Sequence, residues 1–184
     1  MVRTEYIVLA TIAGTAADLI LKKMLSLRRS PKTIILSLVA IVILCMVFDN
    51  PLVIIKGFLF AQILIFAGVY DAKTKIIPDV VHLMIAAVSV IGINPSNAVI
   101  GLVAGLLPFL VIGVVYGGIG GGDIKLMGTA GLVLGGMGII QAGIIGLSTA
   151  LIFALLTGIG KNKSIPLAPF LGLGCFMSYC MTYM

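Results

Sequence analysis

Long apolar segments separated by short polar turns are the feature that most limits how this chain can fold. The segments cover approximately residues 5–21, 33–48, 52–70, 78–93, 97–117, 123–137, 139–158 and 165–183. The sequence is 61% hydrophobic and only 10% charged, whereas a soluble domain carries about 25% charged residues. Too few polar side chains remain to cover a soluble surface, so we expect lipid to surround most of the fold.

The segments are expected to be helices, because a backbone exposed to lipid must satisfy its own hydrogen bonds. A membrane barrel would need alternating polarity, which the sequence lacks. With 184 residues, the chain has room for roughly eight spans of about 20 residues but not for a separate soluble domain. We therefore predict an all-α membrane protein in which residues 1–184 form a single polytopic bundle of about eight transmembrane helices. The first span lacks a convincing cleavage site and is expected to be retained.

The basic residues predict the orientation of this bundle. Ten of the 12 lysines and arginines fall in the loops after spans one, three, five and seven, and only Arg3 and Lys56 fall on the opposite side. Positive residues mark the cytoplasmic side, so both termini are expected outside and the protein is expected in the cell (cytoplasmic) membrane. This distribution assigns the net charge of +6 to membrane orientation and lipid contact rather than to nucleic acid. The ten residues are Lys22, Lys23, Arg28, Arg29, Lys32, Lys73, Lys75, Lys125, Lys161 and Lys163.

Two of the six acidic residues, Asp71 and Asp123, stand at the ends of apolar spans. An acid near lipid is costly, and its presence there suggests a function. The predicted topology puts both at the cytoplasmic membrane surface, where together they would form a carboxylate dyad able to share a proton and hydrolyse a peptide bond. Two alternatives stay open: each acid pairs with a lysine such as Lys73, Lys75 or Lys125, or the acids relay protons in a transporter or channel.

A glycine-rich run precedes the second acid: Tyr116-Gly117-Gly118-Ile119-Gly120-Gly121-Gly122. So much glycine disfavours a stable helix facing lipid. Glycine beside an acid also leaves space for an extended substrate backbone to approach the carboxylate. A phosphate-binding loop is excluded, because no Gly-Lys-Ser/Thr follows. We expect an irregular segment here that gives access to Asp123.

Three segments resemble the motifs of the type IV prepilin peptidases, which belong to the GxGD intramembrane aspartyl proteases. The first is Gly120-Gly121-Gly122-Asp123-Ile124-Lys125-Leu126, and the second is Asp71 followed by Ile77-Pro78-Asp79. The third is Ile165-Pro166-Leu167-Ala168-Pro169-Phe170-Leu171-Gly172-Leu173-Gly174. They occur in the order of the family, and the resemblance covers about residues 50–184.

The resemblance implies an aspartic endopeptidase that removes short basic leaders from prepilin-like or preflagellin precursors at the cytoplasmic membrane edge. Residues 1–50 would be two N-terminal helices and residues 51–184 the catalytic GxGD core. Asp71 and Asp123 would be catalytic, with no metal and no cofactor. The loop Leu25–Lys32 holds no cysteine, so the chain resembles the short forms without the N-methyltransferase insert. Residues near the substrate would be Gly120, Gly122, Lys125, Pro78, Asp79, Pro166 and Pro169.

Several other polar residues have simpler structural explanations. Asp79 follows Pro78 and is expected to open span four, where an acid suits the helix dipole. Asp18 is expected to pair with Lys22, four residues later. His82 is expected to be a hydrogen-bonded imidazole near a helix end. Lys125 either contacts the site or extends to the interface.

The remaining expectations concern packing. The three cysteines, Cys45, Cys175 and Cys180, lack metal-ligand spacing and are expected to be small buried side chains. Pro166 and Pro169 are expected to bend the last span. Asp49 is expected in a solvated outer turn. The pairs Gly101/Gly105 and Gly131/Gly135 are expected to let helices approach closely.

Overall fold

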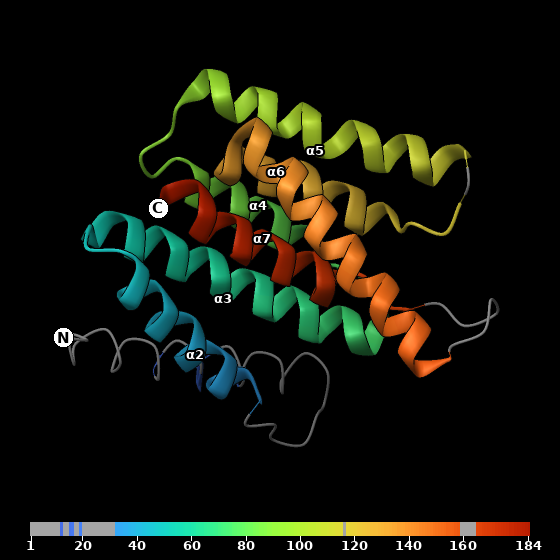
Figure 1. Cartoon of the computed structure of the whole chain (residues 1–184), viewed down its shortest axis with the longest axis horizontal. Coiled ribbons are helices and arrows are strands. Elements are labelled where there is room, and N and C mark those ends of the chain that lie inside the picture. The colour runs from blue at the N-terminus through green and yellow to red at the C-terminus, as the bar shows by residue number, and fades with distance from the viewer. Residues whose placement is uncertain (1–11, 13–14, 17–18, 20–31, 116, 159–164) are drawn as a thin grey trace.

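The computed structural model describes residues 12, 15–16, 19, 32–115, 117–158 and 165–184. All regular secondary structure among these residues is helical (Figure 1), which confirms the all-helical class. The first expected span and its Asp18–Lys22 pair lie almost wholly outside the described residues. The helices are α2 (Lys32–Val47), α3 (Pro51–Thr74), α4 (Asp79–Ser89), α5 (Pro95–Val115), α6 (Gly121–Thr157) and α7 (Ala168–Tyr183).

Three of the described helices, α3, α5 and α6, are long and apolar enough to cross a membrane. The helices α2 and α4 are apolar but shorter. Expected spans two to eight each coincide with a helical segment, which confirms where the apolar helices lie. Because only these three helices meet the length requirement among the described residues, the count of eight crossings stays a prediction.

Helix α6 folds back on itself at Gly135, which has φ 72° and ψ −179°. A positive φ suits glycine, because it has no Cβ to clash with the backbone. Before this residue α6 runs antiparallel to α5, with Gly131 beside Gly101 and Met127 beside Gly105. After it α6 runs parallel to α5, with Ile139 beside Gly105. The gold and orange parts of α6 in Figure 1 are therefore the two arms of a helical hairpin, as expected for spans six and seven.

Glycine allows the arms of this hairpin to pack against α5. A Cβ added to Gly101 would overlap the carbonyl oxygen of Gly131, and a Cβ on Gly131 would overlap that of Gly101. A Cβ on Gly105 would overlap the carbonyl of Met127 in the same way. The expectation of close helix approach at Gly101, Gly105 and Gly131 is confirmed.

The packing puts the ends of the helices at two opposite ends of the bundle. Gly68 lies beside Pro169, while Gly57 lies beside Tyr179, so α3 and α7 are antiparallel. We call the end where α3 stops and α4, α6 and α7 begin the aspartate end. The tyrosine end, opposite to it, holds the turn at Gly135, the loop between α4 and α5, and Tyr183. In Figure 1 the C-terminus lies at this second end, near the α4–α5 loop.

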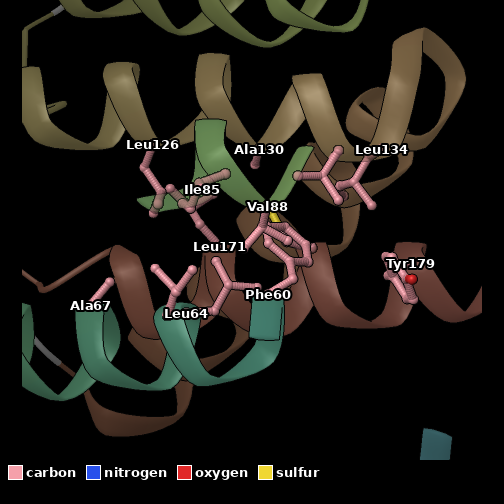
Figure 2. Close-up of a cluster of buried hydrophobic side chains, with 14 of the residues drawn as sticks. Phe60, Leu64, Ala67, Ile85, Val88, Leu126, Ala130, Leu134, Leu171 and Tyr179 are labelled. Carbon is pink, nitrogen blue, oxygen red and sulfur yellow. The ribbon is translucent and has the colours of Figure 1, made fainter. Parts of the chain in front are cut away.

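A buried apolar core holds α3, α4, the first arm of α6, and α7 together (Figure 2). Phe60, Ile85, Leu126 and Leu171 each expose 0% of their surface. Tyr179 is equally buried, and its hydroxyl donates a hydrogen bond of 2.8 Å to the carbonyl oxygen of Val53. The core therefore fixes the four helix ends that meet at the aspartate end.

The prolines of the last motif do not bend a helix, so that expectation is wrong. Helix α7 begins only at Ala168, which leaves Pro166 in the preceding loop and Pro169 in the first turn. Proline fits the first turn of a helix because its missing N–H would have no partner inside the helix. The two prolines start α7 rather than distort it.

Candidate active site

Asp71 lies in the last turn of α3 and is 5% exposed. Its Oδ2 accepts a hydrogen bond of 3.1 Å from the backbone N–H of Ala168, the first residue of α7. Helix α3 stops one turn later at Lys75, whose φ of 56° is left-handed and whose N–H donates to the carbonyl of Asp71. The start of α7 thus orients the buried carboxylate, since buried polar groups need such partners.

Asp123 lies in the first turn of α6 and is 8% exposed. Residues 117–120 before it are not helical, and Gly117 and Gly118 have φ of 71° and 83°. This confirms the irregular glycine segment for the residues described there. The Asp123 N–H donates to the carbonyl of Gly120 at 3.0 Å, while its Oδ1 is buried without a hydrogen-bond partner in the described part of the chain. An unsatisfied buried oxygen is costly, and such atoms mark candidate sites for a proton, water or ligand.

The structure brings Asp71 and Asp123 to the same end of the bundle, although they come from α3 and α6. Each is buried, and the charge of Asp71 acts on the carboxyl group of Asp123. Lys75 lies close enough to act on Asp71 as well. Two interacting carboxyl groups in a poorly hydrated site can hold one proton between them, which is the property that acid–base hydrolysis requires.

The three glycines that precede Asp123 differ in how much space surrounds them. A Cβ on Gly122 would lie 3.1 Å from the Cβ of Ile77, and a Cβ on Gly120 would lie 3.2 Å from Oδ2 of Asp123. A Cβ on Gly121 would meet nothing within 4 Å. Gly122 therefore lets the α3–α4 loop pack on the start of α6, and Gly120 leaves room for the carboxylate.

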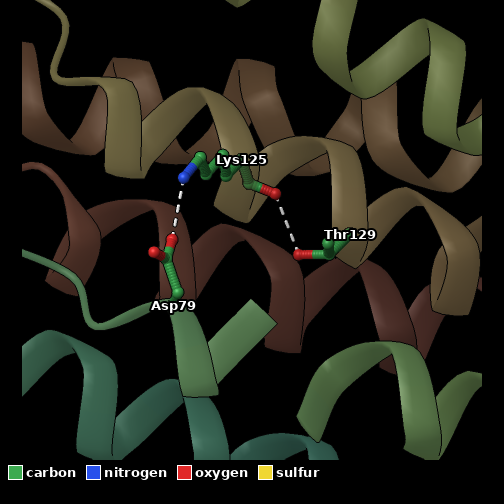
Figure 3. A network of polar contacts seen from close by, with 3 residues as sticks. All are labelled: Asp79, Lys125 and Thr129. Carbon is green, nitrogen blue, oxygen red and sulfur yellow. Dashed lines mark hydrogen bonds and ion pairs between the residues drawn. The ribbon is translucent and has the colours of Figure 1, made fainter. Parts of the chain in front are cut away.

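Lys125 forms an ion pair with Asp79 (Figure 3), with 2.8 Å between Nζ and Oδ1. The pair joins the second turn of α6 to the first residue of α4, and its side chains are 59% and 83% exposed. Asp79 opens α4 after Pro78, as expected. The partner of Lys125 is thus Asp79, a pairing that the sequence did not predict. No sequence signal specifies it, because the two residues are 46 positions apart.

His82 departs from the expectation that its ring is hydrogen bonded. It is 7% exposed, and neither ring nitrogen has a hydrogen-bond partner among the described residues. It lies on the buried face of α4 together with Val81 and Ile85, whose side chains offer no polar atom. The expected hydrogen bond is absent among the described residues because the ring is buried among apolar side chains.

The remaining predicted residues lie near Asp71 or elsewhere in the bundle. Pro169 packs beside Gly68, one turn before Asp71. An apolar groove of about 340 Å³ between α2, α3 and α7 reaches the same place, where Gly68, Ala72 and Pro169 line it. Cys175 is buried as expected, whereas Cys45 and Cys180 are only half-buried. Asp49 is exposed, as expected. In the described ranges no three His, Cys, Asp or Glu residues group to hold a metal ion.

Comparisons with known proteins agree with the family that the sequence resembles. The model of the type IV leader peptidase family matches residues 58–159, a range that holds both aspartates. A prepilin leader peptidase/N-methyltransferase of Bacillus subtilis (strain 168) is 30% identical over 143 residues, which is 72% of this chain and 58% of that protein. The chain thus spans less than two thirds of this curated relative, and no solved structure matches. Since the family match covers more than half of the chain and contains the two buried acids, the chain belongs to the type IV leader peptidase family.

Proposed function

We propose that this chain is a membrane aspartyl endopeptidase that removes the short basic leader from prepilin-like or preflagellin precursors. The curated relative is named as a prepilin leader peptidase and as an N-methyltransferase. Only the peptidase activity is proposed here, because residues Leu25–Lys32, where the longer forms carry their insert, contain no cysteine. In this proposal the dyad faces the cytoplasm, and both termini lie outside.

One observation carries the proposal: two buried carboxylates, from α3 and α6, interact at one end of the bundle. Both are at least nine-tenths buried, with exposures of 5% for Asp71 and 8% for Asp123. Burial of two acids is costly and is explained if they work together. The Oδ1 of Asp123, which lacks a partner in the described chain, is the atom available to hold the shared proton or a water molecule.

The proposed chemistry uses only these two side chains and water. The ionised carboxylate takes a proton from the water as the water oxygen attacks the carbonyl carbon of the peptide bond. The protonated carboxyl donates its proton to the carbonyl oxygen, so that the dyad again holds one proton. As the tetrahedral intermediate collapses, the ionised carboxylate takes a proton from one of its two hydroxyls, the protonated carboxyl donates its proton to the leaving nitrogen, and the carbon–nitrogen bond breaks, so that the dyad once more holds one proton. The Ala168 N–H holds Asp71 in place through these steps.

A proton-coupled transporter is the alternative that the sequence leaves open. It predicts related halves or helices broken near the middle of the membrane. The interruption within α6 is a reversal at Gly135, and it lies at the tyrosine end, away from both acids. This position favours the peptidase, whose chemistry requires only that the two acids meet.

The test is cleavage of precursors by purified protein in detergent. Asp71→Asn and Asp123→Asn should each abolish cleavage, because neither amide can accept the proton from water or share it with the other acid. Since the substrate is not identified, the assay uses a panel of prepilins and preflagellins. Asp49→Asn is the matched control: Asp49 is exposed in the turn between α2 and α3, and its loss should leave cleavage unchanged. A normal rate in either dyad variant would refute the proposal.

A further inference from the structure

The tyrosine end holds a buried lysine that the peptidase chemistry does not use. Lys56 lies in the second turn of α3 and is 4% exposed. Its Nζ donates a hydrogen bond of 3.0 Å to the hydroxyl of Tyr183 and lies 5.2 Å from the centre of that ring. An ammonium group has three donors, and this is the one hydrogen bond that it makes among the described residues.

A buried ammonium is costly without a compensating charge. The ion pair found in the described part of the chain, Lys125–Asp79, lies at the aspartate end, and Lys56 has no acidic partner in that part. The aromatic ring and hydroxyl of Tyr183 compensate the charge only in part, because they carry no full negative charge. The position therefore favours a bound anion.

A polar pocket of about 180 Å³ lies against this lysine. Buried Val133 and Leu134 line it, and its rim includes the exposed residues Asn94 and Asn97. Of the residues that the structure describes, no acidic side chain lines it. The pocket opens at the surface of the bundle, so an ion from solvent or from a lipid headgroup can reach Lys56.

Two helix N-termini add positive potential to the same pocket. Helix α5 begins at its rim, where the side chain of Asn94 accepts the N–H of Asn97. The second arm of α6 begins at Gly136, whose N–H donates a hydrogen bond of 3.1 Å to Oδ1 of Asn97. The N-terminal end of a helix carries partial positive charge and favours anions. Lys56, both helix ends and the side-chain amides thus combine in one site that favours negative charge.

We propose that this pocket binds a phosphate oxyanion, with Lys56 as the charged ligand. The chemistry is shared by the phosphodiester of an anionic phospholipid and by inorganic phosphate. The bound anion would neutralise Lys56 and tie α3, α5, α6 and α7 together at the tyrosine end. This proposal does not depend on the peptidase activity.

The test measures anion binding by the full chain purified in neutral detergent. Phosphatidylglycerol, phosphatidylcholine and inorganic phosphate are titrated separately, with native mass spectrometry and the melting temperature as readouts. Lys56→Gln is the main variant, since its amide can still donate to Tyr183 while the charge is lost. Lys56→Met removes both the charge and the hydrogen-bond donor. Lys73→Gln is the matched control, since Lys73 is exposed at the aspartate end.

Wild type should bind phosphatidylglycerol or phosphate at least about tenfold more tightly than Lys56→Gln, because a charge-assisted hydrogen bond is lost. Lys73→Gln should bind within about twofold of wild type. Lys56-dependent binding of phosphatidylglycerol alone identifies a headgroup site, and Lys56-dependent binding of phosphate identifies a site for a soluble ion. Equal binding by wild type and Lys56→Gln, or no binding of either anion, would overturn the proposal and would indicate that the lysine only holds Tyr183.

Discussion

Adjacent glycines at the start of α6 offer a sharp test of the proposed geometry. Gly122→Ala should impair the protein, and Gly121→Ala should not. The Cβ that Gly122→Ala introduces would lie 3.1 Å from the Cβ of Ile77, whereas carbon atoms prefer about 3.5–4.0 Å. Ile77 is 7% exposed, and its Cβ is fixed to the backbone, so a side-chain rotation cannot relieve the contact. The α3–α4 loop or the first turn of α6 must move instead.

The expected difference in stability follows from comparing the two variants. Overpacking of this kind costs about 1–3 kcal/mol. Alanine is favoured over glycine within a helix by up to about 1 kcal/mol, and this gain is similar for both variants because both positions lie in the first turn. Gly121→Ala meets nothing within 4 Å and should be neutral or stabilising. For a chain of this size the difference corresponds to roughly 2–12 °C in melting temperature.

Cleavage kinetics and thermal unfolding in the same detergent are the two assays. Because Gly122 precedes Asp123, a displacement of a few tenths of an ångström should also lower kcat by about tenfold. Gly121→Ala should retain the rate of wild type. Equal rates and equal melting temperatures for the two variants would refute the close packing of Ile77 on the first turn of α6.

The remaining predictions concern the helix interface, the surface ion pair and metals. Gly101→Ala should destabilise the fold by about 3 kcal/mol or more, because the added Cβ would overlap the Gly131 carbonyl. A melting temperature equal to wild type would contradict the close packing of α5 and α6. Lys125→Gln should barely change the melting temperature, since both side chains of its ion pair with Asp79 are exposed and exposed pairs contribute little. A large drop in melting temperature would contradict this. Cleavage should be unaffected by a chelator such as EDTA, because the dyad supplies acid and base itself; inhibition that added metal reverses would argue against the proposed mechanism.

Much of the fold and both candidate catalytic residues could be predicted from the sequence. Apolar segments locate α2 to α7 because segment length and hydropathy are local properties. The glycine run before Asp123 and the proline before Asp79 likewise mark helix starts by local backbone preference. The sequence also predicts that Asp71 and Asp123 share one end, since each lies at a span boundary with basic residues nearby.

Pairings between distant residues could not be predicted in the same way. The segments are apolar on all sides, so their periodicity does not tell which face meets which neighbour. The bond from Ala168 to Asp71, the ion pair of Lys125 with Asp79 and the buried ring of His82 all depend on how helices pack. The expected bend at Pro166 and Pro169 was wrong because α7 begins at Ala168, three residues after the start of the expected span.

The amino-acid sequence by itself determines that this chain is a helical membrane protein with an acid at the end of one span and another at the start of a second. Hydropathy and the turn preferences of glycine and proline depend on near neighbours in the chain, so they can be recognised without a structure. Only the tertiary structure decided that a backbone N–H of α7 holds Asp71 and that Lys56 is buried beside a polar pocket. These features arise where helices far apart in the chain meet, and close packing and burial at those contacts are properties of the whole bundle.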